Sequence, residues 1–202
     1  MSILQVVPGP HLAAPRDAVR LREALDTAVQ IVDAPSVVRF SGKESGAGEV
    51  PAVGQRHGMD VLLRTDDPTV LVVAVGPLAG TGIAVGERLS DQGIGVTVVD
   101  PVWVLPVNPA LVEMAAEHDL VITVEDNGVV GGVGARLAQE LRFAEVSTPL
   151  REFGIDQRFL DHGSRAQLLE EVGLTPQVIA RYAVEAVVRG DAAPADAPVE
   201  GR

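Results

Sequence analysis

The sequence contains no cysteine and few aromatic residues, and these shortages limit the kinds of cross-link, metal site and hydrophobic core that the protein can form. Without cysteine the chain can form neither disulfides nor thiolate metal sites, which fits the cytoplasmic location that we predict. Phe, Trp and Tyr make up 3% of the 202 residues, whereas 47% are hydrophobic. The hydrophobic core must therefore be built mainly from Val, Leu, Ala and Ile.

Basic residues and long hydrophobic runs are scarce as well. The chain has 16 Lys and Arg against 28 Asp and Glu, which gives a formal net charge of −12. Because duplex nucleic acid is bound by basic surfaces, we predict no nucleic-acid partner. The longest apolar run, residues 69–76, is too short to span a bilayer, and no signal peptide is recognisable. We therefore predict no membrane association.

The first 40 residues combine short apolar runs with one helical pattern. Leu21, Leu25 and Val29 recur at helical spacing after Pro15. We expect a strand–helix–strand piece in residues 1–40, with strands at 2–7, 11–14 and 36–40 and a helix at 15–32.

Three further segments follow. Residues 41–60 are rich in Gly, Ser and Pro, which predicts a linker with a short strand near 50–53. Within 61–189 apolar strands alternate with helices, which predicts an α/β fold: a mostly parallel sheet with helices on both faces. Residues 190–202 lack periodicity and are predicted to be a disordered tail. The expected elements are strands at 69–75, 94–99, 119–124 and 148–155, and helices at 78–92, 109–117, 133–142, 164–172 and 176–188.

A group of glycines is arranged in the order of a dinucleotide site. Gly80, Gly82 and Gly86 follow a strand, and Asp100 ends the next strand. The spacing is one residue longer than G-x-G-x-x-G, and two of the glycines lie inside the expected helix. We therefore predict that these small residues allow the helix to pack closely on the sheet.

The stretch EDNGVVGGVG, residues 125–134, offers a second possible site. Free amides at the start of the following helix could hold an anion. Glu125 and Asp126, however, bring negative charge to the same place. We favour carboxylates that accept hydrogen bonds from these amides, with Asn127 or Gly128 at positive φ, and leave the anion site as the alternative.

Single polar residues give weaker signals. None of the four histidines is spaced to share a metal ion with another, so we predict no metal ligands. His118 is interpreted as a partner of a helix dipole and His162 as a hydrogen-bonding loop residue. Arg39 ends an apolar strand at its carboxyl end, where α/β sheets bind ligands. It either binds a ligand or pairs with an acid of the helix 15–32 or the linker.

Several stretches together resemble one family. PGPHLAAPRDAVRLREAL, VLVVAVGPLAGTGIAVGERL, VDPVWVLPVNPAL, DLVITVEDNGVVGGVGARLAQEL and EFGIDQRFLDHGSRAQLLEEVGLTPQVIA resemble the carboxyl-terminal third of 1-deoxy-D-xylulose-5-phosphate synthases in their actinobacterial form. The resemblance implies a transketolase carboxyl-terminal domain at 61–189, preceded by a remnant of the pyrimidine-binding domain at 1–40. It also implies the family reaction, in which pyruvate and glyceraldehyde 3-phosphate give 1-deoxyxylulose 5-phosphate and carbon dioxide.

The resemblance also shows what this chain lacks. The family uses thiamine diphosphate and Mg²⁺, but its diphosphate and metal motif and its activating Glu have no counterpart in this sequence. We therefore expect no cofactor site and no catalytic residue in this chain alone, and a truncated protein that is inactive by itself. Arg39 matches the family Arg that is implied to bind the acceptor phosphate. The SGKE that follows and Val102 depart from the family pattern.

Three roles remain open on this basis. The chain is a truncated synthase, an interaction module or subunit of a split thiamine-dependent transferase, or a gene remnant. A subunit would form a homo-oligomer or join a partner that supplies the missing domains. Apolar residues on the strands predicted at 2–7 and 36–40 would then be covered in the complex, whereas a monomer would leave those edges unpaired.

Overall fold

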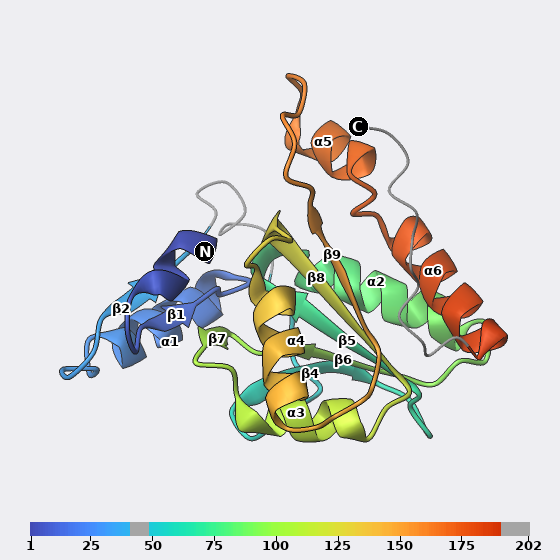
Figure 1. Cartoon of the computed structure of the whole chain (residues 1–202), viewed down its shortest axis with the longest axis horizontal. Helices are drawn as coiled ribbons and strands as arrows, with labels where there is room; N and C mark the ends of the chain where they lie inside the picture. Colours follow the sequence, from blue (N-terminus) through green and yellow to red (C-terminus); the bar gives the residue numbers. More distant parts are fainter. Residues whose placement is uncertain (41–48, 191–202) are drawn as a thin grey trace.

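The computed structural model describes residues 1–40 and 49–190, which form two sheets. The larger sheet has six strands in the order β3-β4-β6-β5-β8-β9, and the smaller one has three in the order β2-β1-β7. Figure 1 shows the smaller sheet and α1 to one side of the larger sheet. The strands of the larger sheet are β3 (Gly54–Arg56), β4 (Met59–Arg64), β5 (Val70–Val75), β6 (Val96–Asp100), β8 (Leu120–Gly128) and β9 (Leu150–Ile155).

The larger sheet is mostly parallel, as predicted. Strands β6, β5, β8 and β9 run parallel to one another, whereas β4 is antiparallel to β6 and β3 is antiparallel to β4. Every residue of β5 is buried. Parallel strands covered on both faces are apolar along their whole length, which is why this run was recognisable in the sequence.

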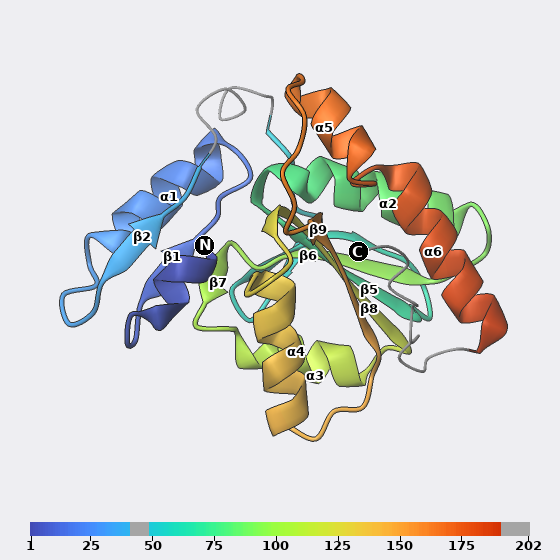
Figure 2. The same ribbon diagram turned by 45° about the horizontal axis from the view of Figure 1, so that its top comes forward.

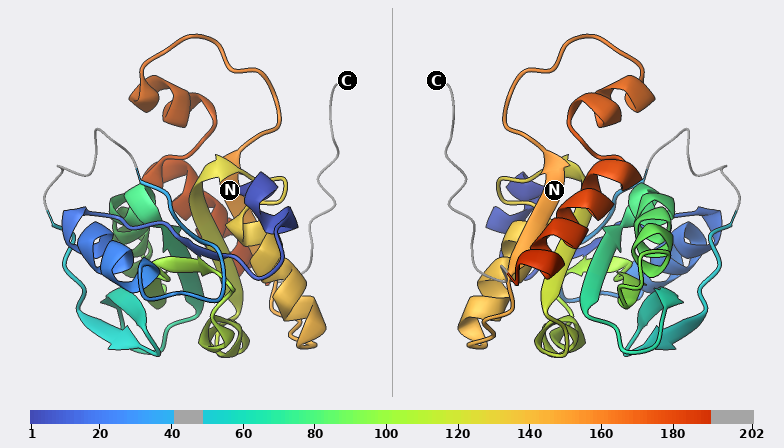
Figure 3. Two further views of the ribbon diagram at one scale, coloured as in Figure 1. Left: turned by 90° about the vertical axis from the view of Figure 1, so that its left-hand side faces the viewer. Right: turned by 90° about the vertical axis from the view of Figure 1, so that its right-hand side faces the viewer.

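Helices cover both faces of the larger sheet, which confirms the predicted architecture. Helices α2 and α6 lie on one face, and α3 and α4 lie on the other (Figure 1, Figure 2). Figure 3 shows α5, with the loop before it, rising above the sheet. The helices expected after residue 60 are all present, with their ends shifted by a few residues: α2 (Ala79–Ser90), α3 (Pro109–Ala116), α4 (Val133–Phe143), α5 (Arg165–Glu171) and α6 (Pro176–Arg189).

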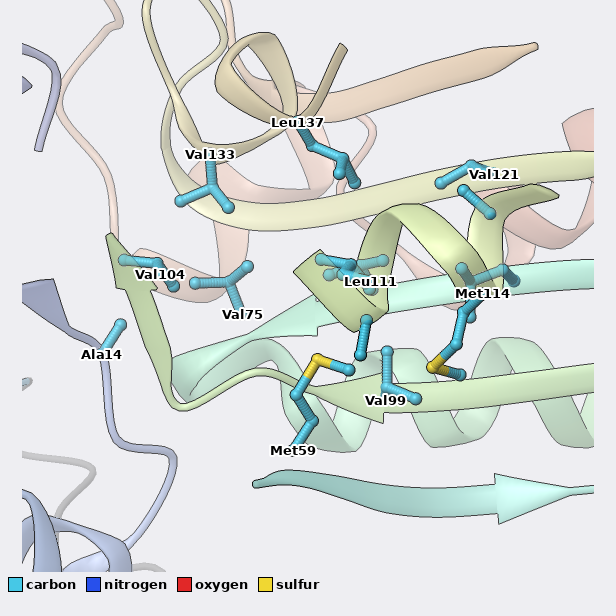
Figure 4. Packing of buried hydrophobic residues seen from close by; sticks show 14 of the residues in the cluster. Ala14, Met59, Val75, Val99, Val104, Leu111, Met114, Val121, Val133 and Leu137 are labelled. Atoms are coloured by element: carbon cyan, nitrogen blue, oxygen red, sulfur yellow. The ribbon is translucent and has the colours of Figure 1, made fainter. Parts of the chain in front are cut away.

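Two apolar cores lie on the two faces of the sheet. Leu71 and Val73 of β5 point towards α3 and α4, and Val70 and Val72 point towards α2 and α6. Figure 4 shows the first core, in which side chains from α3 and α4 pack over the strands. Among the labelled members of that core are Met59, Val75, Val99, Leu111, Met114, Val121, Val133 and Leu137.

The glycines of α2 lie against the sheet, as the packing interpretation requires. A Cβ atom on Gly82 would lie 2.4 Å from the Cβ of Ala74, and one on Gly86 would lie 2.8 Å from Cγ2 of Val98. Gly80 has open space around it. Two of the three glycines therefore permit close contact between helix and sheet, at the expense of helix propensity.

Residues 1–40 form the expected strand–helix–strand unit except at their start. Strands β1 and β2 pair in parallel on either side of α1 in the chain. The strand predicted at 2–7 was wrong, because a short 3₁₀ helix, η1, occupies it and its Ile3 and Val6 are exposed rather than paired. The elements are η1 (Ser2–Val6), β1 (His11–Ala13), α1 (Ala18–Ala28) and β2 (Ser36–Val38).

Two short strands after residue 40 differ from the prediction. Strand β7 (Trp103–Leu105), which was not predicted, pairs antiparallel with β1. Part of the predicted linker is also strand, because β3 and the start of β4 fall within it. The short strand expected near 50–53 is instead β3 (Gly54–Arg56). The linker residues 41–48 and the tail residues 191–202 lie outside the described residues, and the division into domains stays a prediction.

Candidate functional site

The carboxyl end of β8 meets the first turn of α4, where an anion site was the alternative prediction. The carboxylate of Glu125 is fully buried there, and it accepts hydrogen bonds from the amides of Val133 and Gly134, each at 2.9 Å. A Cβ on Gly132 would lie 2.4 Å from one carboxylate oxygen. The protein therefore fills this helix N-terminus with its own carboxylate, and the favoured interpretation is confirmed.

Burial dominates the titration of this carboxylate. It raises the pKa of Glu125, although the amides of Gly134 and Val133 and the side chain of Asn127 oppose the shift. One detail of the prediction was wrong. The residue of this turn with positive φ is Gly131, at 66°, rather than Asn127 or Gly128, because β8 runs on through both of them to Gly128.

Arg39 lies next to the same end of β8. Its Nη2 donates to the carbonyl oxygen of Asp126 at 2.8 Å, and the Asp126 carboxylate in turn accepts from Arg165 at 2.7 Å. Arg39 is half-buried. Its observed partner is thus on β8, whereas linker residues 41–48, one of the places considered for a partner, lie outside the described residues. His162 is exposed in the loop before α5.

A buried ionic network, which the sequence did not reveal, joins the first 40 residues to the larger sheet. Asp60 of β4 and Asp100 of β6 are directly opposite each other in the antiparallel register. Nη1 of Arg16 lies 2.6 Å from Oδ2 of Asp60 and 2.8 Å from Oδ2 of Asp100. Arg20 also pairs with Asp60. Two like charges across a strand pair would repel, so the cation from residue 16 is required there.

The network has further partners that hold its members in place. Nε of Arg16 donates to the carbonyl of Val50 at 2.9 Å, and Asp17 caps α1 by accepting from the amide of Arg20 at 2.9 Å. The side chain of Arg16 is 2% exposed. Its guanidinium therefore donates to the carbonyl oxygen of Val50 and to carboxylates on two strands of the larger sheet.

The two carboxylates titrate differently. Burial raises the pKa of Asp100 to about 6, against the opposing hydrogen bonds from the Val102 amide and Arg16. Burial also acts to raise the pKa of Asp60, but hydrogen bonds from Arg20, Arg16 and Gln55 outweigh it and leave the pKa below its ordinary value. At Asp60 the hydrogen bonds to the arginines thus outweigh desolvation, whereas at Asp100 desolvation outweighs the hydrogen bonds.

Val102 directly follows this network, at the position where the family pattern has a polar residue. Its φ is 56°, a left-handed conformation that is strained for a β-branched side chain. Its amide donates to Oδ1 of Asp100 at 2.9 Å. The backbone at this position is therefore held by Asp100, and the buried Val side chain provides no charge for a ligand.

His118 is buried just after the end of α3. Its Nδ1 lies 2.6 Å from the carbonyl oxygen of Met114 in the last turn of α3, and its Nε2 lies 3.1 Å from Oγ1 of Thr97. Burial lowers the pKa of His118, against the hydrogen bond to Met114. The ring therefore bridges the end of α3 to β6, and its interaction with the helix dipole stays a prediction.

Two observations bear on the cofactors of the resembling family. Within 1–40 and 49–190 no group of three or more His, Asp or Glu residues is placed to hold a metal ion. The helix N-terminus of α4, whose amides suit a diphosphate, is occupied by Glu125. None of the described helices is long and apolar enough to cross a membrane.

Comparison with known proteins gives a consistent result. Residues 60–179 match the family described as transketolase, C-terminal domain. The chain is 56% identical over 193 residues to a 1-deoxy-D-xylulose-5-phosphate synthase of Parafrankia sp., covering 94% of this chain and 30% of the relative. It is 55% identical over 202 residues to that of Frankia casuarinae, covering 98% of this chain and 31% of the relative. The resemblance to these synthases is thereby confirmed.

Solved structures show the same fold. A split-gene transketolase described as an inactive β4 tetramer matches with a TM-score of 0.77 and 25% identity, covering 93% of this chain and 61% of that chain. A transketolase of Pichia stipitis matches with a TM-score of 0.66 and 17% identity, covering 93% of this chain and 26% of that chain. The chain spans about 30% of the length of the curated relatives it matches. It belongs to the transketolase C-terminal domain family.

Proposed function

We propose that this chain is one part of a 1-deoxy-D-xylulose-5-phosphate synthase-like, thiamine diphosphate-dependent transferase, and that it does not catalyse turnover by itself. The observation that carries the proposal is the pattern of identity. More than half of the residues match those of the synthases over nearly the whole chain, yet the match covers about 30% of the relatives. The complete reaction would join pyruvate to glyceraldehyde 3-phosphate with loss of carbon dioxide.

The site geometry supports the need for a second component. The amides at the start of α4 are used by Glu125, and the described acids form no metal-binding group. Thiamine diphosphate and Mg²⁺ would therefore be held by residues of a partner chain. A protein of similar fold is described as a split-gene transketolase in the form of an inactive β4 tetramer. We propose that this chain likewise depends on a second component that holds the cofactors, and that the complete enzyme is located in the cytoplasm.

Arg39 keeps its proposed role as a ligand for the acceptor phosphate. It follows the carboxyl end of β2, and one nitrogen of its guanidinium is held by the Asp126 carbonyl. A guanidinium fixed through one nitrogen can offer its other N–H groups to a phosphate as a pair. The nearby carboxylate of Asp126 is engaged by Arg165, which reduces its repulsion of an anion.

Release of carbon dioxide tests the proposed function. The purified chain is mixed with pyruvate labelled at its carboxyl carbon, glyceraldehyde 3-phosphate, thiamine diphosphate and Mg²⁺. We expect release at background for this chain alone. Release should rise above background when the chain is co-expressed with the portion of the Frankia casuarinae synthase that it does not match. Turnover by the chain alone, or a silent co-expressed pair, would contradict the proposal.

A module that only self-associates is the second candidate. It is favoured by the split-gene transketolase of similar fold, which forms a β4 tetramer. Sedimentation of the pure chain combined with the activity measurement separates the two candidates, because a self-associating module would form oligomers and give an inactive co-expressed pair.

A further inference from the structure

Asp126 of β8 lies between two arginines that come from distant parts of the chain. Its carbonyl oxygen accepts a hydrogen bond from Nη2 of Arg39 at 2.8 Å, and its carboxylate Oδ2 accepts one from Nη2 of Arg165 at 2.7 Å. The side chain of Asp126 is 17% exposed and that of Arg165 is 38% exposed. Because the carbonyl and the carboxylate belong to one residue, both guanidinium groups lie close to the same negative charge.

Arg165 reaches Asp126 from α5, a helix that adds no buried residue to the hydrophobic core. All of Arg165–Glu171 lies within the described part of the chain, and none of its residues is buried. A capping box fixes the start of α5: the hydroxyl of Ser164 accepts from the amide of Gln167, and the Gln167 side chain accepts from the amide of Ser164. Figure 3 shows α5 above the end of the sheet at which β8 and β9 finish. The helix therefore presents Arg165 to the carboxyl end of β8.

The charges around Asp126 favour an anion next to Arg39. Arg39 and Arg165 carry two positive charges and Asp126 one negative charge, which leaves one net positive charge here in a chain whose formal net charge is −12. The carboxylate of the adjacent Glu125 is engaged elsewhere, because it accepts from the amides at the start of α4. The positive balance depends on Arg165, since the charges of Arg39 and Asp126 alone would cancel.

We propose that Arg165 is a positioning residue of the phosphate site formed by Arg39, a role that rests on the proposed function. Its guanidinium holds the Asp126 carboxylate away from Arg39 and neutralises it. Without this partner the carboxylate would compete with phosphate for the guanidinium of Arg39. It would also repel the phosphate at short range, where salt screens little. Arg165 therefore favours an acceptor that carries a phosphate over one that does not.

Two variants separate a positioning residue from a direct phosphate ligand. R165M leaves the Asp126 carboxylate without its Arg165 partner, whereas D126N/R165M removes both charges of the ion pair and keeps the backbone carbonyl that holds Arg39. We expect R165M to weaken phosphate binding about fivefold and D126N/R165M to restore it. A direct ligand would leave the double variant as weak as R165M. Both variants lack the link between α5 and β8, so a loss of structure at α5 would affect both alike.

Titration of the purified chain with inorganic phosphate at constant ionic strength measures this binding without turnover. The NMR shift of the backbone amide of residue 126 gives the dissociation constant. R39M should abolish the saturable shift, which assigns the phosphate to Arg39. The matched control is R136M, which removes an arginine of similar exposure, 35%, from its pair with Glu140 at 2.7 Å. R136M should bind phosphate as the wild type does.

Three results of the titration would overturn the positioning role. The first is the absence of a saturable shift in the wild-type chain. The second is wild-type affinity in R39M or R165M, or an affinity of R136M that falls as far as that of R165M. The third is a double variant that binds no more tightly than R165M.

The complex with the unmatched portion of the Frankia casuarinae synthase adds a measurement of specificity. R165M should raise the KM for glyceraldehyde 3-phosphate about fivefold and leave kcat and the KM for D-glyceraldehyde within about twofold of the wild type. A fall in kcat with an unchanged KM would contradict the positioning role.

The two measurements also separate this role from the proposed function. Carbon dioxide release by the wild-type complex decides the proposed function, whereas the phosphate titration needs no turnover. Release together with an unaltered phosphate affinity of R165M would uphold the function and overturn the role of Arg165. The expected phosphate affinities without carbon dioxide release would uphold the role of Arg165 in binding phosphate and overturn the function.

Discussion

Individual residues of this protein show how a buried charge is placed by partners distant in sequence. Asp100 has no exposed surface and lies opposite Asp60 on the neighbouring strand, and Arg16, from the segment between β1 and α1, lies between them. A sequence shows that these residues are charged but not that they meet. Glu125 is different, because its position before a glycine-rich helix start already predicted that it would accept from the helix amides.

The titration of Asp100 predicts how stability depends on pH. Burial raises its pKa to about 6, so the folded protein binds a proton at Asp100 more readily than the unfolded chain does. The contribution of Asp100 to the free energy of unfolding therefore increases as the pH falls from about 7 to about 4, by up to ~3 kcal/mol. The variant D100N lacks this contribution. In urea unfolding, the stability of wild type minus that of D100N should grow on acidification.

Other groups do not obscure this comparison. His118, whose pKa is lowered by burial, loses stability as the pH falls, but it is present in both proteins and cancels in the difference. The pKa of Asp60 lies below its ordinary value, so its contribution is lost only at lower pH. A difference that stays constant between about pH 7 and about pH 4.5 would show that Asp100 titrates normally in the folded state.

At the scale of elements, packing rather than local propensity decides the role of the glycines in α2. Gly82 faces Ala74 of β5 at a separation that leaves no room for a methyl group, whereas Gly80 faces open space on the same helix. The helical period indicated these positions, but only the sheet beneath α2 distinguishes one glycine from the other.

The two glycines predict opposite effects of the same substitution. G82A should lower the free energy of unfolding by about 1–3 kcal/mol, because α2 must move away from β5 to accommodate the methyl group. G80A should raise it by about 0.5–1 kcal/mol, because alanine favours the helix and nothing obstructs its methyl group. Urea unfolding of both variants measures whether each substitution raises or lowers the free energy of unfolding. Equal effects would contradict the close contact between α2 and β5.

The long elements were predictable from the sequence, and some of the short ones were not. Strand β5 is a continuous apolar run, and helices α3, α4 and α6 have helical periodicity and are bounded by Gly, Pro or capping residues such as Thr175. Strands β3 and β7 have three residues each, too few for a period to appear. Residues 2–6 were predicted as a strand but form η1, in which the polar side chains of Ser2 and Gln5 donate hydrogen bonds to carbonyls of the turn before α4.

At the scale of the whole molecule, several contacts join the small sheet and its flanking residues to the larger sheet, and two of them stand out. Strand β7 pairs with β1, and Arg16 reaches Asp60 and Asp100. Both contacts connect segments that lie far apart in the sequence. The division of the chain into a domain remnant at 1–40 and a carboxyl-terminal domain at 61–189 stays a prediction.

Replacing Arg16 tests this coupling. R16M leaves Asp60 and Asp100 facing each other without the central cation, so we expect a loss of about 3–5 kcal/mol in the free energy of unfolding. Amides of β1 and β2 should exchange faster than those of β5, because the small sheet loses its anchor. The control R189M removes an exposed pair with Glu185 and should change stability by less than about 0.5 kcal/mol. Equal losses would rule out the coupling.

The α/β class, the alternation of strands and helices, the family and the capture of the α4 amides by a carboxylate follow from the amino-acid sequence alone. Each of these depends on local periodicity or on residues close together in the chain. The bridge from Arg16 to Asp60 and Asp100, the pairing of β7 with β1 and the contact of Arg39 with Asp126 became known from the folded structure. These contacts depend on strand register and packing between distant segments, which leave no periodic trace in the sequence.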